Sequence, residues 1–341
     1  MKKISVIIPC YNVAPFIDRC MTSIITQTIG IDNLEIICLD DASADSTWEH
    51  LVKWEQCYPE HIKLIRHEVN RRQGAARNLG LQYASADWVA FVDADDWLEQ
   101  DYFEQLYNPV TEYPCDVVAC GVLGDTSGSL IYFSEEQRLG GIDRYIEADS
   151  EEALREMFED KILGEGPAAK IIRKGLLTAC NIYFPEGVAY EDHYWIPLLY
   201  IHTQKAYVVE KKLYHYFSNV NSTCSLRNQY YHIDWITVQL MKWEDYKKRG
   251  LWRKYHEIME GDALYDAAMF VVTLIYQYDD PPFSYFLLES ELIKQQVPEY
   301  KNNRYAAKFP DPYPLLLKAL YTGSDKAVFE RLIETIRKAF R

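Results

Sequence analysis

Three aspartates directly follow a hydrophobic segment in the first third of the chain. Trp88–Val92 has the composition of a buried strand, and Asp93, Asp95 and Asp96 come immediately after it. Carboxylates this close together repel one another unless a cation lies among them. Two carboxylates one residue apart can share a hard divalent metal with phosphate oxygens, an arrangement typical of magnesium and manganese in phosphate chemistry. The segment therefore predicts a divalent cation, Mn²⁺ or Mg²⁺, and a phosphate-bearing ligand.

The segments that must position these acids alternate between strand and helix. The apolar runs that predict strands are Ile4–Ile8, Leu34–Leu39, Ile62–Ile65 and Trp88–Val92. Between them, apolar residues recur at helical spacing. Strands that are apolar on both faces and joined by helices indicate a mostly parallel sheet covered by helices on both sides, which is an α/β fold.

Polar residues also follow the first and second predicted strands. The first strand ends in Pro9, Tyr11 and Asn12, and the second ends in Asp40 and Asp41. Because ligands of such sheets bind at the carboxyl ends of the strands, we expect these residues to meet the later aspartates at one edge. Neither GxGxxG nor GxxxxGK[ST] is present, so the metal must hold the phosphates of a bound nucleotide.

Composition limits the remaining choices. The 341 residues are enough for two domains, and the net charge of -15 argues against nucleic acid as a partner. Eight scattered cysteines without a CxxC pair predict reduced thiols in a cytoplasmic protein. The N-terminal apolar segment is too short for a signal peptide, and the run 267–276 is too short to span a bilayer. We therefore expect a soluble protein.

Three stretches together resemble the glycosyltransferase family 2 enzymes, which have the GT-A fold. The stretches are SVIIPCYNVAPFIDRCMTSIITQT, LEIICLDDASADST and NRRQGAARNLGLQYASADWVAFVDADDWL. The resemblance is strong over residues 3–110, weaker over 165–225 and absent beyond 226. The order and spacing of the motifs make it specific, whereas Asp93-x-Asp95 alone would be a weak signal.

The resemblance implies a nucleotide-sugar donor, with a UDP-sugar favoured. Pro9, Tyr11 and Asn12 would line the nucleoside pocket, with Tyr11 near the base. Asp41 would accept an N–H from the edge of the base, and Asp40 would support that loop. The alternatives are that Tyr11 and Asn12 are only turn residues and that Asp40 and Asp41 cap the next helix.

The same resemblance assigns the phosphate and metal contacts. Asp93 and Asp95 would form a DxD pair, with Asp93 toward the ribose and Asp95 on the metal. Gly74 and Arg77 match the stretch that closes over the donor. Lys170 would neutralise the diphosphate or pair with an acid. Arg77 could instead form an ion pair with Asp40 or Asp87, and Asp96 could be an N-cap or could support the other acids.

Glycosyl transfer also needs a base, because the acceptor hydroxyl must lose its proton as it attacks the sugar. The segment PEGVAYEDHYW, residues 185–195, resembles the ED motif of the family. The resemblance implies that Asp192 is the base and that Glu191 beside it contacts the acceptor. Both carboxylates would also be favoured simply by a helix N-terminus, and His193 could titrate near neutral pH.

One expected cation is missing. Many relatives carry an arginine after the second aromatic residue of the segment that matches 213–225, but Phe217 and Ser218 stand there in this chain. Arg227 could replace that arginine, or His215 could reach the metal.

The predicted organisation is a GT-A domain over 1–225, with a nucleotide-binding half (1–110) and an acceptor half (111–225). A helical extension follows over 226–341. The basic and aromatic residues of 247–255 could contact membrane phosphates peripherally, although a solvated basic helix face is the simpler explanation. Homodimerisation and acceptor binding by the extension both stay open.

The combined prediction is an inverting, metal-dependent glycosyltransferase. Its acceptor would be a saccharide or a lipid-linked glycan, as in surface polysaccharide biosynthesis. The alternatives are a noncatalytic sugar-nucleotide-binding protein and a metal-dependent nucleotidyltransferase. Against the latter, the glycine- and lysine-rich signature usual near the first strand is absent.

Overall fold

The computed structural model describes residues 2–124, 142–219, 222–323 and 325–339. The chain forms two compact units. The first, here called the sheet unit, comprises Met1–Gly187 and Trp195–Asn219. The second, the helical unit, comprises Val188–Tyr194 and Val220–Arg341. Residues 188–194, which lie in the predicted acceptor half, thus group with the C-terminal helices.

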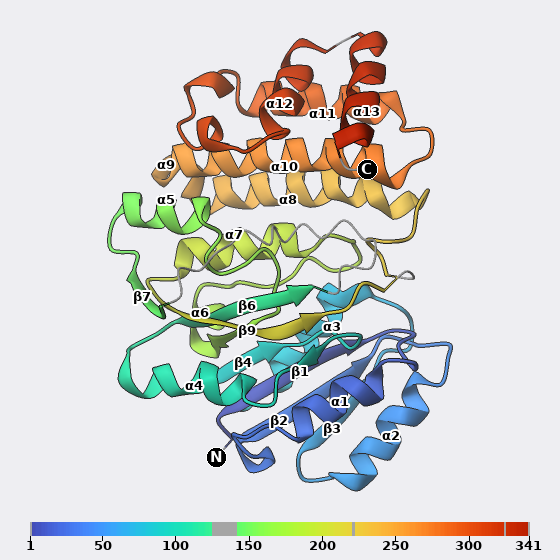
Figure 1. Cartoon of the computed structure of the whole chain (residues 1–341), viewed down its shortest axis with the longest axis vertical. Helices are drawn as coiled ribbons and strands as arrows, with labels where there is room; N and C mark the ends of the chain where they lie inside the picture. Colours follow the sequence, from blue (N-terminus) through green and yellow to red (C-terminus); the bar gives the residue numbers. More distant parts are fainter. Residues whose placement is uncertain (1, 125–141, 220–221, 324, 340–341) are drawn as a thin grey trace. The chain divides into compact units, whose positions relative to one another are not determined.

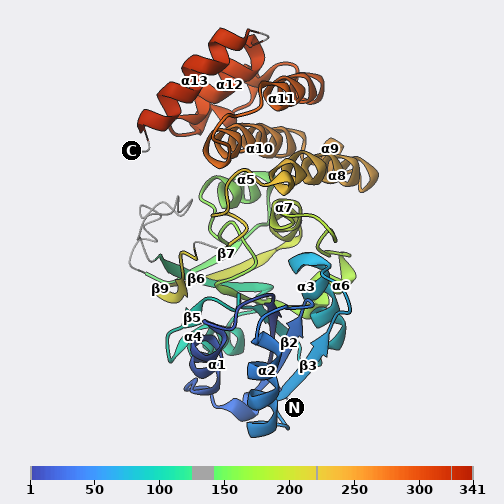
Figure 2. The ribbon, with the colours of Figure 1, turned by 90° about the vertical axis from the view of Figure 1, so that its right-hand side faces the viewer.

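The N-terminal half of the sheet unit is a parallel sheet. Its strands, in the order β3-β2-β1-β4, are β3 (Ile62–Arg66), β2 (Leu34–Asp40), β1 (Ile4–Cys10) and β4 (Trp88–Phe91). The connecting helices are α1 (Ile17–Ile25), α2 (Thr47–Cys57) and α3 (Arg72–Tyr83). Right-handed crossovers place α1 and α2 on one face and α3 on the other, as Figure 2 shows. The predicted alternation of strands and helices is confirmed.

The sheet continues beyond β4 with mixed directions (Figure 1). The further strands are β5 (Trp97–Leu98), β6 (Val117–Gly124), β7 (Arg144–Glu147), β8 (Lys170–Arg173) and β9 (Lys205–Tyr216). The helices are α4 (Tyr102–Glu112), α5 (Glu151–Glu159), α6 (Lys174–Ala179) and α7 (Asp192–His202). Helix α7 belongs to the sheet unit only from Trp195 onward. Strand β8 pairs antiparallel with both β4 and β6, whereas β6 and β9 run parallel.

Burial explains why the N-terminal sheet forms. All seven residues of β1 are buried, which requires cover on both faces of the strand. Helix α3 lies very close to β1, since a Cβ built on Gly80 would come within 2.4 Å of Cγ2 of Ile7. Small residues on α3 therefore allow the helix to approach the sheet that carries the acidic strand ends.

The helical unit surrounds one long apolar helix. It contains α8 (Asp234–Lys248), α9 (Leu251–Lys254), α10 (His256–Gln277), α11 (Phe283–Gln296), α12 (Tyr313–Thr322) and α13 (Lys326–Ala339). Helix α10 packs against α8, α11, α12 and α13. It ends at Gln277, and Pro282 directly precedes α11 because proline is favoured before a helix rather than within one. The predicted helical extension is confirmed.

Two further features concern the chain as a whole. All eight cysteines are free, and five of them are buried. Within the described ranges, no helix has both the length and the apolar character needed to cross a membrane. Of the basic residues at the end of α8, Lys248 pairs with Glu244 and Arg249 with Asp245. Membrane contact and homodimerisation stay predictions.

Candidate donor and acceptor site

The turn Asp93–Asp96, here called the acid turn, connects β4 to β5. The N–H of Val92 donates to the carbonyl of Ile7 at 3.1 Å, so the end of β4 stays tied to β1 up to the first aspartate. The N–H of Asp96 then donates to the carbonyl of Asp93 at 3.1 Å and closes the turn. Asp96 is buried, whereas Asp93 and Asp95 are partly exposed. The two acids of the predicted DxD pair are thus the accessible ones.

Arg77 of α3 neutralises the first acid. Its Nη2 lies 2.8 Å from Oδ1 of Asp93 and also donates to Gln73 at 3.0 Å. The guanidinium is buried and packs over the ring of Phe184 at 5.3 Å. Asp93 was not among the ion-pair partners proposed from the sequence. The pair places a fixed cation beside the predicted metal site.

The other two acids bind the end of β9 and the residues after it. Asn219 donates from Nδ2 to Oδ2 of Asp95 at 3.1 Å. Asp96 accepts the hydroxyl of Tyr214 at 2.6 Å and the backbone N–H of Phe217 at 2.7 Å. Asp96 supports the turn and does not cap a helix, because α4 begins at Tyr102 with Asp101 at its N-cap. The N-cap alternative for Asp96 is therefore wrong.

Burial and mutual repulsion raise the proton affinity of these carboxyls. Burial raises the pKa of Asp95, and the charge of Asp93 raises it further. Burial, followed by the charges of Asp93 and Asp95, raises the pKa of Asp96 well above its ordinary value. A cation at the acid turn would relieve this repulsion. Among the described residues, however, no three His, Cys, Asp or Glu side chains form a metal site by themselves.

The acids that follow β2 are held by residues after β3. Oδ2 of Asp40 lies 2.8 Å from Nε of Arg66. Oδ1 of Asp41 lies 2.6 Å from Nδ1 of His67 and accepts the N–H of Arg71 at 2.9 Å. Neither acid caps α2, whose N-cap is Ser46, so that alternative is wrong. Instead, both carboxylates are fixed at the sheet edge.

The loop after β1 is joined to the loop after β2. Pro9 is buried within β1, and Tyr11 beyond it is 48% exposed. Asn12 adopts a left-handed backbone with φ of 53°. Its N–H donates to Oγ of Ser43 at 3.0 Å, and its Oδ1 accepts the N–H of Ala44 at 2.9 Å. Asn12 therefore holds the two loops together, and the ring of Tyr11 beside it is exposed at the surface.

Two other predicted donor residues have packing roles in the sheet unit. Nζ of Lys170, at the start of β8, is buried and donates to the carbonyls of Gly166 and Ala168, the latter at 2.6 Å. Burial lowers the pKa of Lys170 to about 7, although Cys120 and Asp93 oppose this shift. A Cβ on Gly74 would come within 2.2 Å of the carbonyl oxygen of Pro185. Whether either residue also contacts a donor stays a prediction.

Arg19 is a cation near the acid turn that motif comparison alone does not identify. Its guanidinium lies over the ring of Trp97 at 3.8 Å and that of Phe217 at 4.8 Å. Its Nη2 donates to the carbonyl of Asp95 at 2.8 Å. Phe217 thus occupies the position of the expected arginine and packs against an arginine from α1.

The two residues considered as replacements for that arginine have other partners. Nε2 of His215 lies 2.7 Å from Oε1 of Glu99, and its ring stacks on Trp97 at 4.8 Å. Arg227 belongs to the helical unit and pairs with Asp279 at 2.8 Å. These contacts account for both side chains without a ligand.

Glu191 and Asp192 lie in the short segment 188–194 of the helical unit. Asp192 begins α7 and is half-buried, and Glu191 is buried. The Oδ1 of Asp192 accepts the N–H of His193 at 3.1 Å. A carboxylate in the first turn of a helix is stabilised by the helix dipole. Both the predicted base role and the simple helix-terminus role are compatible with this placement.

Known proteins resemble the chain in sequence. It is 34% identical over 221 residues to the glycosyltransferase GlyA of Streptococcus pneumoniae, a match covering 63% of this chain and 30% of GlyA. It is 29% identical over 213 residues to the poly(ribitol-phosphate) beta-glucosyltransferase of Bacillus spizizenii, covering 62% of this chain and 30% of that protein. The matched part of the chain thus spans less than a third of the length of each of these relatives.

Similarity to a solved structure extends over nearly the whole chain. The structure of Staphylococcus aureus TarS 1–349 in complex with UDP-GlcNAc superposes with a TM-score of 0.59 at 19% identity, covering 98% of this chain and 83% of that one. This likeness confirms the predicted GT-A fold. The family model for glycosyl transferase family 2 matches residues 5–179, just over half of the 341 residues. The chain therefore belongs to glycosyl transferase family 2.

Proposed function

We propose that the protein is an inverting glycosyltransferase that moves a sugar from a nucleotide-diphosphate sugar to an acceptor hydroxyl. The observation that carries this proposal is the acid turn. Two accessible carboxylates, Asp93 and Asp95, lie at the end of β4, and Arg77 lies 2.8 Å from the first of them. This is the edge of the parallel sheet at which α/β proteins bind nucleotides.

The ends of β1 and β2 supply the nucleoside pocket. Tyr11 offers an exposed ring for stacking on the base, and Asn12 holds its loop against the loop after β2. Asp41 accepts an N–H from the base, with its carboxylate oriented by His67 and Arg71. Asp40 is held by Arg66 and supports the loop from below.

Asp93 and Asp95 fit Mn²⁺ or Mg²⁺. Both metals prefer carboxylate oxygens and keep positions for substrate phosphates, so two side chains are sufficient protein ligands. Burial raises the pKa of Asp95 first, and the neighbouring charge of Asp93 raises it further, so a cation would be favoured beside these carboxylates. A bound divalent cation would stabilise the charge that develops on the departing nucleotide diphosphate. Arg77 keeps Asp93 in place and balances its charge.

Asp192 is the proposed base. It removes the proton of the acceptor hydroxyl as that oxygen attacks the sugar on the face opposite the diphosphate, which inverts the configuration. Glu191 contacts the acceptor. The ED motif supports these assignments, and the start of α7 gives the carboxylate of Asp192 a favourable position.

A UDP-sugar is the favoured donor, since UDP-GlcNAc is bound in the TarS structure whose fold this chain shares. The relatives include a poly(ribitol-phosphate) beta-glucosyltransferase, which favours a role in surface polysaccharide or glycan synthesis. A saccharide or lipid-linked acceptor would follow from such a role, at the inner face of the membrane.

Thermal unfolding with UDP, GDP, TDP and CMP, each with and without Mn²⁺, tests the donor site. A nucleotide at 100 times its dissociation constant should add about 2.7 kcal/mol of stability. We expect UDP to stabilise the protein only when Mn²⁺ is present, and we expect UDP-GlcNAc or UDP-glucose to be cleaved to UDP. No shift with any nucleotide would refute the donor site. Binding without cleavage, also with saccharide acceptors present, would favour the noncatalytic alternative.

A further inference from the structure

We infer that the helical unit positions the catalytic base, and that His193 and Asp266 are positioning residues for Asp192. The inference rests on the proposed function of Asp192. It assigns a task to α8 and α10, which lie outside the part of the chain that the family model matches.

Residues on both sides of the acidic pair are held by the rest of the helical unit. The N–H of Ala189 donates to Oδ2 of Asp234 at 2.9 Å. The hydroxyl of Tyr190 lies 2.7 Å from Nδ1 of His232. On the other side of the acidic pair, the hydroxyl of Tyr194 donates to Oδ2 of Asp245 at 2.9 Å. The two carboxylates are therefore fixed from both sides in sequence.

The backbone before the acidic pair is strained. Tyr190 has φ of 61°, which is rare for a bulky residue and is tolerated only where surrounding contacts enforce it. Its ring is buried against Trp235 of α8, with the ring centroids 4.9 Å apart. This strained turn sets the backbone direction with which Glu191 and Asp192 follow Tyr190 within the helical unit.

His193 connects the segment to a buried chain of charges. Its Nδ1 lies 3.7 Å from Oδ1 of Asp266 on α10, and its ring lies over Trp235 with centroids 4.0 Å apart. Asp266 in turn pairs with Lys242 of α8. The ammonium group of Lys242 also lies 2.7 Å from Oδ2 of Asp262. This series of charged contacts therefore links His193, the residue next to Asp192, to both α8 and α10.

The ion pairs that connect His193 to Lys242 are deeply buried. Lys242 is fully buried, and Asp266 is 2% exposed. A buried ion pair rarely contributes more to folding stability than apolar residues of similar size would, whereas the loss of one partner from the pair is costly. These buried ion pairs are thus better suited to enforcing one arrangement of the side chains than to adding stability. The last residue held by these ion pairs is His193. Its backbone N–H donates a hydrogen bond to the side chain of Asp192.

The charge of His193 follows from the same contacts. Burial alone would lower its pKa, but the carboxylates of Asp266 and Asp192 outweigh burial and raise it. A protonated ring keeps the attraction to Asp266 and places a cation beside the base.

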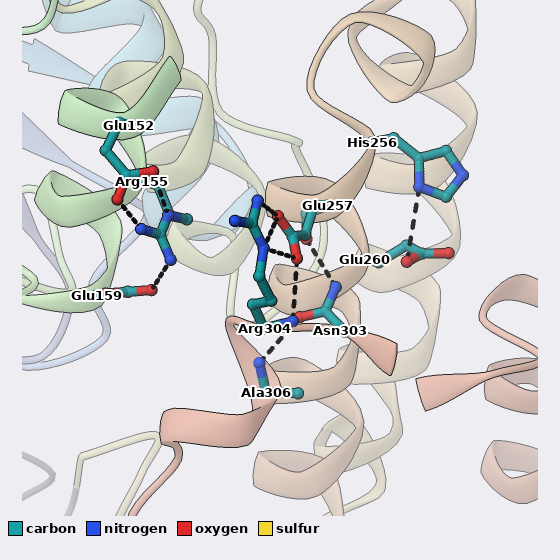
Figure 3. A network of polar contacts seen from close by, with 9 residues as sticks. All are labelled: Glu152, Arg155, Glu159, His256, Glu257, Glu260, Asn303, Arg304 and Ala306. Carbon is teal, nitrogen blue, oxygen red and sulfur yellow. Dashed lines mark hydrogen bonds and ion pairs between the residues drawn. The ribbon is translucent and has the colours of Figure 1, made fainter. Parts of the chain in front are cut away.

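The test compares two substitutions with a matched control. Asp266→Asn removes the acid that faces His193. His193→Phe keeps a ring on Trp235 but removes the charge, and because the His193 side chain is 22% exposed, this variant should fold even if Asp266→Asn does not. The control is Glu257→Gln, which removes another acid of α10. Glu257 pairs with Arg304, with Nε of Arg304 lying 2.8 Å from Oε1, as Figure 3 shows.

The readouts are the rate of UDP release from UDP-GlcNAc with Mn²⁺, the dissociation constant of UDP, and the melting temperature. Asp266→Asn and His193→Phe should lower kcat by about tenfold to a hundredfold, the range expected when a catalytic group is misplaced by about 1 Å. The dissociation constant of UDP should not change. The control variant Glu257→Gln should keep the wild-type kcat and the wild-type dissociation constant of UDP. In an Asp192→Asn background, neither substitution should lower UDP release further.

Three results would overturn the inference. They are unchanged kcat in His193→Phe, weakened UDP binding that accounts for the loss of rate, and an equal proportional loss in the Asp192→Asn background. Failure of the wild-type protein to release UDP from any donor is a different result. It would refute the proposed function itself and, with it, the role assigned to Asp192.

Discussion

The hydroxyl of Tyr214 lies between the two ends of the acid turn. It donates to Oδ2 of Asp96 at 2.6 Å and accepts the backbone N–H of Asp93 at 3.1 Å. One side chain on β9 therefore satisfies a buried carboxylate and a strand-end N–H together. The accessible acids Asp93 and Asp95 are held on a turn whose interior is fixed by this phenol.

Tyr214→Phe should destabilise the sheet unit. The substitution keeps the ring but leaves a buried acceptor and a partly buried donor without their partner, at a cost of about 1–3 kcal/mol. Urea denaturation measures the loss. Tyr145→Phe is the control, because the hydroxyl of Tyr145 bonds to Glu147 at an exposed position and its removal should change stability by less than about 0.5 kcal/mol. Equal effects of the two substitutions would contradict the bridging role.

Gly74→Ala should be damaging for a steric reason. The added methyl would meet the carbonyl oxygen of Pro185 at 2.2 Å, so backbone must move, at a cost of about 1–3 kcal/mol. Gly175→Ala is the matched substitution, because the nearest atom to its Cβ would be Nη1 of Arg173 at 3.7 Å. Gly175→Ala should therefore cost nothing. Thermal unfolding distinguishes the two, and a neutral Gly74→Ala would show that the packing is looser than described.

Asp95→Ala and Asp192→Asn should fail in different ways. Asp95→Ala removes a proposed metal ligand, so it should abolish both UDP release and the Mn²⁺-dependent stabilisation by UDP. Asp192→Asn removes only the proposed base, so UDP with Mn²⁺ should still add about 2.7 kcal/mol at 100 times the dissociation constant. The same thermal measurements, paired with a UDP-release assay, test both. Loss of UDP binding in Asp192→Asn would remove that residue from the base role.

Local sequence patterns were sufficient to predict the strands and their acidic ends. Strands β1, β2 and β4 are almost wholly buried, and an apolar run of this kind can hardly form anything but a covered strand. The edge strand β3 is less apolar, because Lys63 and Arg66 are exposed. The positions of Asp40, Asp93 and Asp95 at the carboxyl edge then follow from the parallel arrangement. These features depend on residues that are neighbours in the sequence.

The hydrogen-bond and ion-pair partners of these aspartates could not be predicted from local sequence patterns. Arg77 pairs with Asp93, and Tyr214 bonds to Asp96 across 118 positions of sequence. A strand pattern tells which face of β9 a residue occupies, but not which side chain it meets. The grouping of residues 188–194 with the helical unit depends likewise on tertiary contacts such as that between Tyr190 and His232.

Glu289 on α11 should make stability depend on pH. Its Oε1 accepts Nε2 of Gln239 at 2.9 Å, while Oε2 has no hydrogen-bond partner among the described residues. Burial raises the pKa of Glu289 from 4.5 to about 7, and the charge of Asp266 contributes in the same direction. The folded protein therefore holds a proton that the unfolded chain releases at lower pH.

The sign of the effect follows from that proton. The folded state binds more protons than the unfolded state between pH 4.5 and about 7, so the contribution of Glu289 to stability is full below this window and is lost as the pH rises through it. The loss amounts to about 3 kcal/mol across the window. Glu289→Gln should abolish this part of the pH dependence and be relatively more stable at pH values above the window. Urea denaturation at both ends of the window measures it, with the exposed Glu291→Gln of the same helix as the control. If Glu289→Gln follows the wild-type pH profile, Glu289 is ionised in the folded protein throughout.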